Sequence, residues 1–464
     1  MGNGVARQYV AATTAALSVF IAGCWLGWPS PAVKMIMNKE AHITIEQDQI
    51  AWIVSLMDFG NVLSPIPSGY MADYFGRKIT LISTAFLYIV TWVLAIFATT
   101  APYLYAARIG AGIGKGFAFT VVPMYLGELA GVKVRGAIST IFTGLLYSGI
   151  LFEYCVGPFV SYNVLNIISG IIPIVFFVTF IWMPESPYFL LMKGQQKKAR
   201  ESLAWFRGAN VADVKTNEEL EEMSRIVKKE MEEKGSFKDL MATPGNRKAM
   251  AIVMLLSSFQ RLGGISPMLA YTVITLPSTG GYFKPDFYMI IFGIALVVGN
   301  FGGIPLIDRV GRKPLLMISC LGCATLTGIS CVFYWIQESN DVSSYNWIPY
   351  VCFASYGITY SIGIGVIPST FVAELFPTNV KSFASAIAAI FFAVASFAIN
   401  RMYLAVQSDL GVFYNFGLFT FSSLVSAVFT YFVVFETKGK TFAEIQKKLN
   451  EGRNQREENI ALNT

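Results

Sequence analysis

The chain has 464 residues, of which 54% are hydrophobic and only 14% are charged. This balance excludes a set of ordinary soluble domains and predicts a protein whose main solvent is lipid. The net charge of +6 does not indicate a nucleic-acid partner, because Lys and Arg stand in short segments between apolar runs. In such segments positive charge sets the orientation in the membrane.

Twelve apolar runs follow one another along the chain. A transmembrane helix needs about 20 apolar residues, and such runs begin near residues 9, 50, 79, 102, 136 and 163, and again near residues 249, 287, 314, 347, 380 and 412. We therefore predict an all-α membrane protein with twelve transmembrane helices in two six-helix halves. The expected domains are an N-terminal half (1–183), a cytoplasmic helical linker (184–248), a C-terminal half (249–436) and a cytoplasmic tail (437–464).

Basic residues predict the orientation. The short loops that carry Arg77 with Lys78, Arg312 with Lys313, and Lys438 all lie on the same side of the membrane as the charged linker. By the positive-inside rule this side is cytoplasmic. We expect a multi-pass protein of the cell membrane with both termini in the cytoplasm.

The two halves carry matching charged motifs. Asp73-x-x-Gly-Arg77-Lys closes the second span, and Asp308-x-x-Gly-Arg312-Lys closes the eighth. Two further repeats set Glu128 seven residues before Arg135 and Glu374 seven residues before Lys381, and place Glu185 after the sixth span and Glu436 after the twelfth. Parallel repeats of this kind predict halves related by an axis along the membrane normal, with the solute path between them.

These repeated charges predict an inner gate. Acidic and basic groups at the cytoplasmic ends of the spans can pair across the two halves only when those ends are close, which would lock an outward-facing state. An alternative is that they anchor helix ends at the lipid headgroups. Repetition of the motifs in both halves favours the gate.

Spans one, four, seven and ten contain glycine and proline residues that predict helix breaks near a midplane binding site. On the fifth span, Thr143, Tyr147, Ile150 and Tyr154 recur at helical spacing, so hydroxyl groups and aromatic rings share one face. Hydroxyl-bearing ligands with apolar ring faces suit such a surface. An ordinary helix-packing face explains the same pattern equally well.

Four charges are embedded in apolar runs: Arg108, Lys115, Glu153 and Arg261. One charge at the bilayer centre costs about 2.5 to 3.5 kcal/mol, so it is rarely kept without a partner. We predict a pair between Lys115 and Glu153, or between Glu153 and Arg261. The alternative is that Lys115 reaches the headgroups and Glu153 faces water on the outer side.

Six segments carry a family resemblance: GYMADYFGRK, PMYLGELAGVKVRG, PESPYFLL, DRVGRK, VAELFPTNVKS and FETKGKTFAEI. They resemble the sugar-porter branch of the major facilitator superfamily, which contains facilitative glucose and trehalose transporters. The resemblance implies alternating access by rocking of two helix bundles, with a sugar as substrate and facilitative uniport. It also implies the members of the inner-gate network: Asp73, Arg77, Glu128, Arg135, Glu185, Asp308, Arg312, Glu374 and Glu436.

The expected sugar contacts, from the resemblance and from the face of the fifth span, are Thr143, Ile150, Gln260, Arg261, Ser266, Tyr271, Ser369 and Phe392. Tyr271 would act as an outer lid. Several of these positions depart from the family pattern, because sugar porters place amide or Trp side chains where this chain has Thr143, Arg261, Ser266, Ser369 and Phe392. The pocket should therefore contain fewer amides than a glucose site.

Two other functions compete with facilitative transport. Proton-linked members of the family have an Asp in the first span, where Trp25 stands here, and this difference favours a facilitator. A proton-coupled symporter stays an alternative, because Glu153 can take the place of that Asp. A sugar sensor that does not transport is the second alternative. An enzyme is not expected, because the sequence has neither a phosphate-binding GxxxxGK[ST] loop nor a nucleophile elbow. We expect no cofactor and no metal, a sugar and the lipid bilayer as partners, no nucleic acid, and a monomer.

Overall fold

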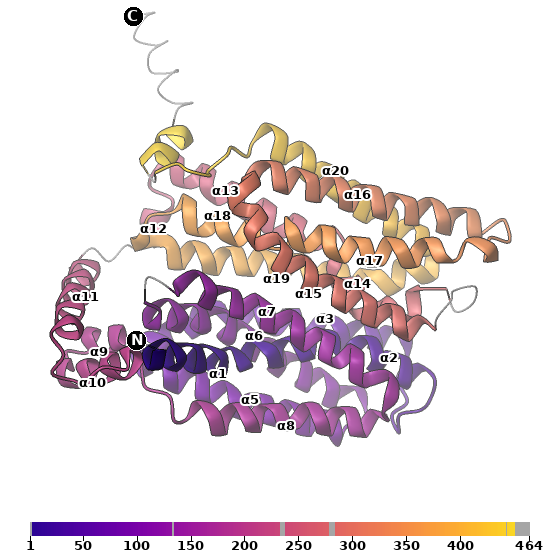
Figure 1. Ribbon diagram of the computed structural model, residues 1–464. Coiled ribbons are helices and arrows are strands. Elements are labelled where there is room, and N and C mark those ends of the chain that lie inside the picture. Colours follow the sequence, from indigo (N-terminus) through magenta and orange to yellow (C-terminus); the bar gives the residue numbers. More distant parts are fainter. Residues whose placement is uncertain (1, 132–133, 233–236, 278–283, 442, 451–464) are drawn as a thin grey trace, which may run out of the picture.

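The computed structural model describes residues 2–131, 134–232, 237–277, 284–441 and 443–450, and all the regular secondary structure in these ranges is helical. Eleven segments are long and apolar enough to cross a membrane. A twelfth consists of α3 (Gln47–Leu63) and α4 (Pro65–Phe75), which meet at an angle of 48°. The long helices run side by side in two bundles, one from each half of the chain (Figure 1). The prediction of an all-α membrane protein of twelve spans in two halves is confirmed.

The N-terminal bundle holds six spans. Its core includes a stack of two indole rings, those of Trp25 and Trp92, whose centroids are 4.0 Å apart. Besides α3 and α4, its helices are α1 (Gly2–Gly27), α2 (Pro29–Met37), α5 (Arg77–Ile96), α6 (Ala101–Leu129), α7 (Arg135–Val156) and α8 (Tyr162–Phe180).

The C-terminal bundle repeats this arrangement. Several helices of both bundles begin with proline in the first turn, where its missing N–H group costs nothing and its fixed φ angle suits a helix. The C-terminal helices are α13 (Pro244–Leu262), α14 (Ile265–Thr275), α15 (Pro285–Val310), α16 (Arg312–Gln337), α17 (Trp347–Ile362), α18 (Ile367–Leu375), α19 (Thr378–Asp409) and α20 (Val412–Phe432).

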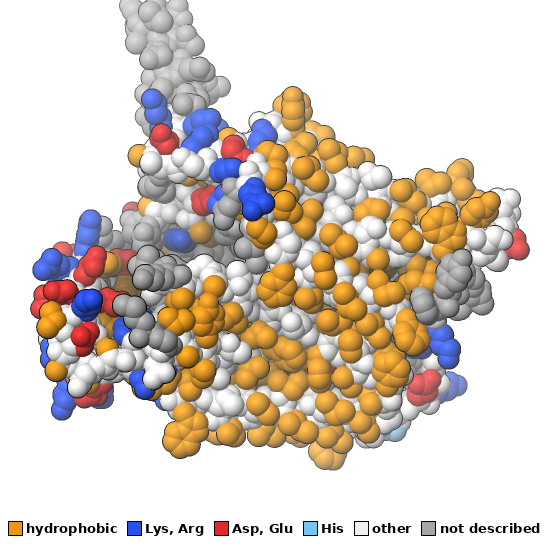
Figure 2. All heavy atoms as spheres, in the orientation of Figure 1, with side chains coloured by type: hydrophobic (Ala, Val, Ile, Leu, Met, Phe, Trp, Pro, Cys, Tyr) orange, Lys and Arg blue, Asp and Glu red, His pale blue; other side chains and the backbone are white. Residues whose placement is uncertain are grey.

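The segment between the bundles forms four short helices at one end of the molecule: α9 (Pro187–Met192), α10 (Gln196–Arg207), α11 (Val214–Glu232) and α12 (Phe237–Leu240). We call this end the linker side and the opposite end the far side. Tyr125 Oη donates to the carbonyl of Pro184, and Arg207 Nη1 donates to that of Leu129, so the linker is fixed to α6. Charged side chains gather at the linker side, whereas apolar side chains cover the middle of the face shown in Figure 2.

Three of the four predicted helix breaks are present. Trp28 separates α1 from α2, residues 363–366 separate α17 from α18, and Gly263 with Gly264 separates α13 from α14. Gly264 adopts a φ angle of 102°, which favours glycine. The prediction was wrong for the fourth span, because α6 continues without interruption from Ala101 to Leu129.

The glycines of α6 instead form a packing face. A Cβ atom at Gly112 would lie 1.9 Å from the carbonyl oxygen of Met57, and one at Gly116 would overlap Ser64 Oγ. Small residues spaced by four let two membrane helices approach closely. This contact sets α3 directly against α6 and brings Lys115 beside Asp58.

Candidate functional site: a charged central pocket

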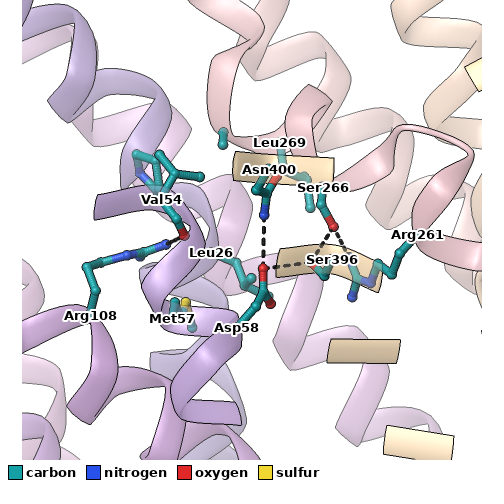
Figure 3. Close-up of a pocket in the computed structure, with 12 residues that line it drawn as sticks. Leu26, Val54, Met57, Asp58, Arg108, Arg261, Ser266, Leu269, Ser396 and Asn400 are labelled. Carbon is teal, nitrogen blue, oxygen red and sulfur yellow. Dashed lines mark hydrogen bonds between the residues drawn. The ribbon is translucent and has the colours of Figure 1, made fainter. Parts of the chain in front are cut away.

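A pocket lies between the two bundles (Figure 3). Both halves contribute to its wall, as a solute path between the halves requires. The N-terminal half supplies Leu26, Pro29, Val54, Met57, Asp58 and Arg108, and the C-terminal half supplies Arg261, Ser266, Leu269, Ala270, Ser396 and Asn400.

Asp58 connects the two halves inside this pocket. Its Oδ2 accepts hydrogen bonds from Ser396 Oγ at 2.7 Å and from Asn400 Nδ2 at 2.9 Å, both on α19. Its Oδ1 lies 3.5 Å from Lys115 Nζ on α6. All four side chains are buried. Sequence reasoning missed Asp58, Ser396 and Asn400, although an acidic residue inside an apolar run is itself a signal of function in a membrane helix.

The predicted ion pairs of Glu153 were wrong. Lys115 pairs with Asp58, and Glu153 Oε1 accepts a 2.5 Å hydrogen bond from Ser169 Oγ on α8, within the N-terminal half. The Cβ of Glu153 faces Gly27 of α1. Depth along the helices matched Lys115 with Glu153, but the rotation of α7 about its axis directs Glu153 away from the pocket. Glu153 is fully buried, which also excludes the alternative that it faces outer water.

Arg261 points into the pocket from the end of α13. Its guanidinium carbon lies 3.8 Å from the ring centroid of Phe392, and its Nη1 donates to Ser266 Oγ at 3.0 Å. Ser266 Oγ in turn lies 2.8 Å from Ser396 Oγ, so a continuous polar chain runs from Arg261 to Asp58. Three of the predicted sugar contacts, Arg261, Ser266 and Phe392, are therefore brought together.

Arg108 is a second buried cation of the pocket wall, and backbone groups satisfy it. Its guanidinium donates to the carbonyl oxygens of Ile53, Trp25 and Val54 at 2.8, 2.5 and 3.1 Å. The guanidinium carbon of Arg108 also lies 5.8 Å from the ring centroid of Trp25 and 5.9 Å from that of Trp28. Arg108 thus ties α6 to α1 and α3.

The remaining predicted contacts, Thr143, Ile150, Gln260, Tyr271 and Ser369, are not among the residues that line this pocket. Tyr271 stacks on Tyr403, with ring centroids 5.0 Å apart, and Gln260 Nε2 donates to the carbonyl of Gly365 at the break between α17 and α18. Ile150 is buried, whereas Ser369 is exposed. Thr143 donates to the carbonyl of Thr140 in its own helix, and Ser369 donates to the carbonyl of Val366, just before α18.

The face of α7 that carries these residues packs against the C-terminal half. Tyr154 Oη donates to the carbonyl of Leu269 on α14 at 2.7 Å. Tyr147, Ile150 and Tyr154 belong to the same apolar cluster as the side chains of α13, α14 and α15. This part of the face therefore seals the two halves together in the present conformation.

Further contacts seal the halves at the far side. Lys34 Nζ of α2 lies 2.6 Å from Asp286 Oδ2 of α15, and Arg401 Nη2 of α19 lies 2.7 Å from Asp48 Oδ1 of α3. The described ion pairs between the halves lie here, and the pocket is therefore closed toward the far side.

At the linker side the N-terminal half holds a compact charge cluster. Arg77 donates through Nε and Nη2 to Glu128 Oε1 at 3.0 and 2.8 Å, and through Nη1 to Asp73 Oδ1 at 3.2 Å. The side chain of Arg77 is only 2% exposed. Charge-assisted bonds at this burial are strong.

The C-terminal half repeats the cluster in a more open form. Arg312 lies 3.1 Å from Glu374 Oε1, and Thr437 Oγ1 donates to Glu374 Oε2 at 2.5 Å. Here the arginine side chain is 15% exposed.

Two glutamates explain the repeated Gly-Arg-Lys motif. Glu185 accepts from the backbone N–H groups of Arg77 and Lys78, which begin α5, and Glu436 accepts from those of Arg312 and Lys313, which begin α16. Each carboxylate therefore caps the positive end of a membrane helix. Gly76 and Gly311 have φ angles of 101° and 104°, and a Cβ there would lie 2.2 and 2.7 Å from the capping carboxylate.

The folded protein shifts the pKa values of the two capping carboxylates, Glu185 and Glu436, in opposite directions. Burial raises the pKa of Glu185 despite its backbone donors, whereas at Glu436 the backbone N–H groups outweigh burial and lower the pKa. The ionised carboxylate of Glu436 stabilises the folded state. This stabilisation is complete above the unfolded-state pKa and is lost as the pH falls through the folded-state pKa. For Glu185, the sign is opposite, and stability falls as pH rises from the unfolded-state pKa to the folded-state pKa.

We therefore expect Glu436→Gln to lower the Tm at pH 7 by more than Glu185→Gln does. Both substitutions remove one acceptor oxygen from a helix cap of the same geometry, so each variant is the matched control of the other. Thermal unfolding of the purified variants measures the difference. A larger decrease in Tm for Glu185→Gln would show that the pKa values of the two carboxylates are not shifted in opposite directions.

The predicted inner gate is only partly visible in this conformation. The ion pairs described for Arg77, Glu128, Arg312 and Glu374 stay within one half of the molecule. The side chains of Arg135 and Asp308 lie outside the described part of the structure. Pairing of the two clusters across the halves stays a prediction for the other conformation.

Two helix bundles around a pocket that both halves line, and that is closed toward the far side, have the architecture of a membrane transporter. The model of one family, described as Sugar (and other) transporter, matches residues 10–449. The chain belongs to this family, and it is a transporter and not an enzyme.

Similar proteins agree with this assignment. The facilitated trehalose transporter Tret1 of Polypedilum vanderplanki is 31% identical over 452 residues, covering 95% of this chain and 88% of the relative. Its namesake from Bombyx mori is also 31% identical, with 96% and 87% covered. Among solved structures, the proton:xylose symporter XylE bound to 6-bromo-6-deoxy-D-glucose superposes with a TM-score of 0.76 at 21% identity, covering 96% of this chain and 99% of that one. The last comparison shows the shared fold.

Proposed function

We propose that this protein carries a hexose or trehalose across the cell membrane by facilitative uniport. The observation that carries the proposal is the pocket shared by both halves, closed at the far side by bonds that connect α2, α3 and α7 to α14, α15 and α19. Rocking of the two bundles would break these bonds and open the pocket toward the far side. The trehalose transporters that match 95% and 96% of the chain support a sugar as the solute.

The proposed orientation places the linker side in the cytoplasm. Arg77, Lys78, Arg312 and Lys313 lie at that side, and basic residues favour the cytoplasmic face. The start of α1 lies there too, because Gln8 Nε2 donates to the carbonyl of Phe206 on α10. The described residues 443–450 also lie there, because Gln446 Nε2 donates to the carbonyl of Leu375 at the end of α18. The proposal keeps the expected domains of 1–183, 184–248, 249–436 and 437–464. Residues of one chain line the pocket from both halves, which supports a monomer as the working unit.

Proton-coupled symport is the second candidate. Asp58 supports it, because this buried carboxylate bonds to Ser396 and Asn400 of the other half. When the halves part, those two donors would be lost and the carboxylate would gain access to water. A carboxylate whose environment changes between states is the usual carrier of a coupled proton.

Uptake into proteoliposomes separates the two candidates. The purified chain is reconstituted, and labelled trehalose, glucose and fructose are followed with and without an inwardly directed proton gradient. We expect saturable uptake that stops at equal concentrations inside and outside and is insensitive to the gradient. Accumulation above that level under the gradient would establish symport, and binding without flux for every sugar would contradict transport.

A further inference from the structure

We propose that the central pocket selects a sugar that carries one negative charge, such as a sugar carboxylate, and that Arg261 is the residue that binds the charge. The inference rests on the proposed transport of sugars and adds the chemical class of the substrate.

The charge balance of the site is the first observation. Three cations, Arg108, Lys115 and Arg261, surround a single carboxylate, that of Asp58, among the described residues of the pocket and their ion-pair partners. None of these four residues is more than 7% exposed. Buried charges at membrane depth are costly unless they are paired, so an excess of positive charge needs compensation.

The three cations are not equivalent. Arg108 uses its donors on three backbone carbonyls, and Lys115 lies next to the carboxylate of Asp58. Arg261 has neither an acidic partner nor a carbonyl partner among the described residues, and the one acceptor that it contacts is the neutral hydroxyl of Ser266. Arg108 and Arg261 therefore both lack a carboxylate partner among the described residues, but only Arg261 keeps donor groups that no acceptor occupies.

The guanidinium of Arg261 also presents the right edge to a ligand. Nη1 is engaged with Ser266, whereas Nε is buried without a hydrogen-bond partner and no bond is described for Nη2. Nε and Nη2 together form the fork that binds both oxygens of a carboxylate. In Figure 3 the Arg261 side chain extends toward Ser266 and Ser396 in the pocket.

Phe392 fixes this orientation. Its ring centroid lies 3.8 Å from the guanidinium carbon of Arg261 and 5.7 Å from Lys115 Nζ, so one aromatic ring contacts a cation from each half. Cation–π contact orients a guanidinium but leaves its in-plane N–H groups free to donate. One free pair of N–H donors on a planar guanidinium matches the two oxygens of a carboxylate.

D-Glucuronate and D-glucose form a suitable probe pair, because they differ only in a carboxylate or a hydroxymethyl group at one carbon. Isothermal titration calorimetry on the purified full-length chain measures the affinity for each. We expect glucuronate to bind at least about tenfold more tightly, as one charge-assisted bond contributes roughly a tenfold factor or more. Arg261→Gln should abolish this preference while its glucose affinity changes by less than the glucuronate affinity, and Arg261→Lys should retain part of the preference.

Arg247→Gln is the matched control, because Arg247 is an exposed arginine near the start of the same helix. It should keep the full preference. Equal affinities for the two sugars, or an equal loss of both in Arg261→Gln, would overturn the inference. Failure of the proposed function looks different: glucuronate would bind, but neither labelled glucuronate, added to the proteoliposome assay for this purpose, nor any of the three neutral sugars would be taken up. Flux of neutral sugars without preferential glucuronate binding would overturn the inference alone.

Discussion

Asp58→Asn is expected to destabilise the folded protein by about 3 to 5 kcal/mol and to reduce transport at least about tenfold. The substitution removes the carboxylate next to Lys115 and leaves that ammonium group buried without a counter-charge. It also weakens the contact between the halves, because Ser396 and Asn400 both donate to the same carboxylate oxygen. Thermal unfolding in detergent and uptake in proteoliposomes measure the two effects.

A double-mutant cycle isolates the ion pair. Lys115→Met alone leaves Asp58 with two neutral donors, and the double variant Asp58→Asn with Lys115→Met removes both charges. We expect the double variant to be more stable than Asp58→Asn by at least about 1 kcal/mol, because no unpaired ammonium group remains. Additive losses would show that Asp58 and Lys115 do not stabilise each other.

Arg77→Ala should cost more stability than Arg312→Ala, although the two arginines hold corresponding places in the repeated motif. Arg77 is 2% exposed and donates to Glu128 twice, so its removal strands a buried carboxylate, at about 3 to 5 kcal/mol. Arg312 is 15% exposed and its partner Glu374 is 23% exposed, so water replaces part of what is lost. We expect about 1 to 2 kcal/mol there.

Each of these two variants is the control for the other, because both remove an arginine from the same motif at the same side of the membrane. The difference in Tm between them, measured on purified protein, is the decisive quantity. An equal or larger loss for Arg312→Ala would contradict the view that the N-terminal cluster is the tighter anchor. It would indicate that Arg312 contributes more to the stability of the folded protein than its exposure implies.

The sequence was sufficient for the architecture because lipid constrains it strongly. A membrane span must satisfy its own backbone hydrogen bonds, so each long apolar run becomes a helix. The repeated Asp-x-x-Gly-Arg-Lys motif also placed the two halves in register. The structure adds the reason for its glycine, which lets Glu185 and Glu436 approach the first N–H groups of α5 and α16.

Side-chain pairing in the pocket was much harder to predict. Helix rise gives the depth of a residue, but the partner depends on how each helix is rotated, and that is set by packing. The glycine face of α6 turned Lys115 toward Asp58, whereas α7 turned Glu153 toward Ser169. The same glycines had been expected to break the helix, because a packing face and a flexible site have the same composition.

Cross-linking across the far side tests alternating access most directly. Cysteines replace Lys34 and Asp286, whose charged groups lie 2.6 Å apart, in a background where the exposed Cys155 is serine. A reducible bifunctional thiol reagent then joins α2 to α15, with the Lys34→Cys single variant as control. We predict that the cross-linked protein loses sugar flux and regains it after reduction. Flux at the uncross-linked rate in the fully joined protein would contradict transport by parting of the two halves.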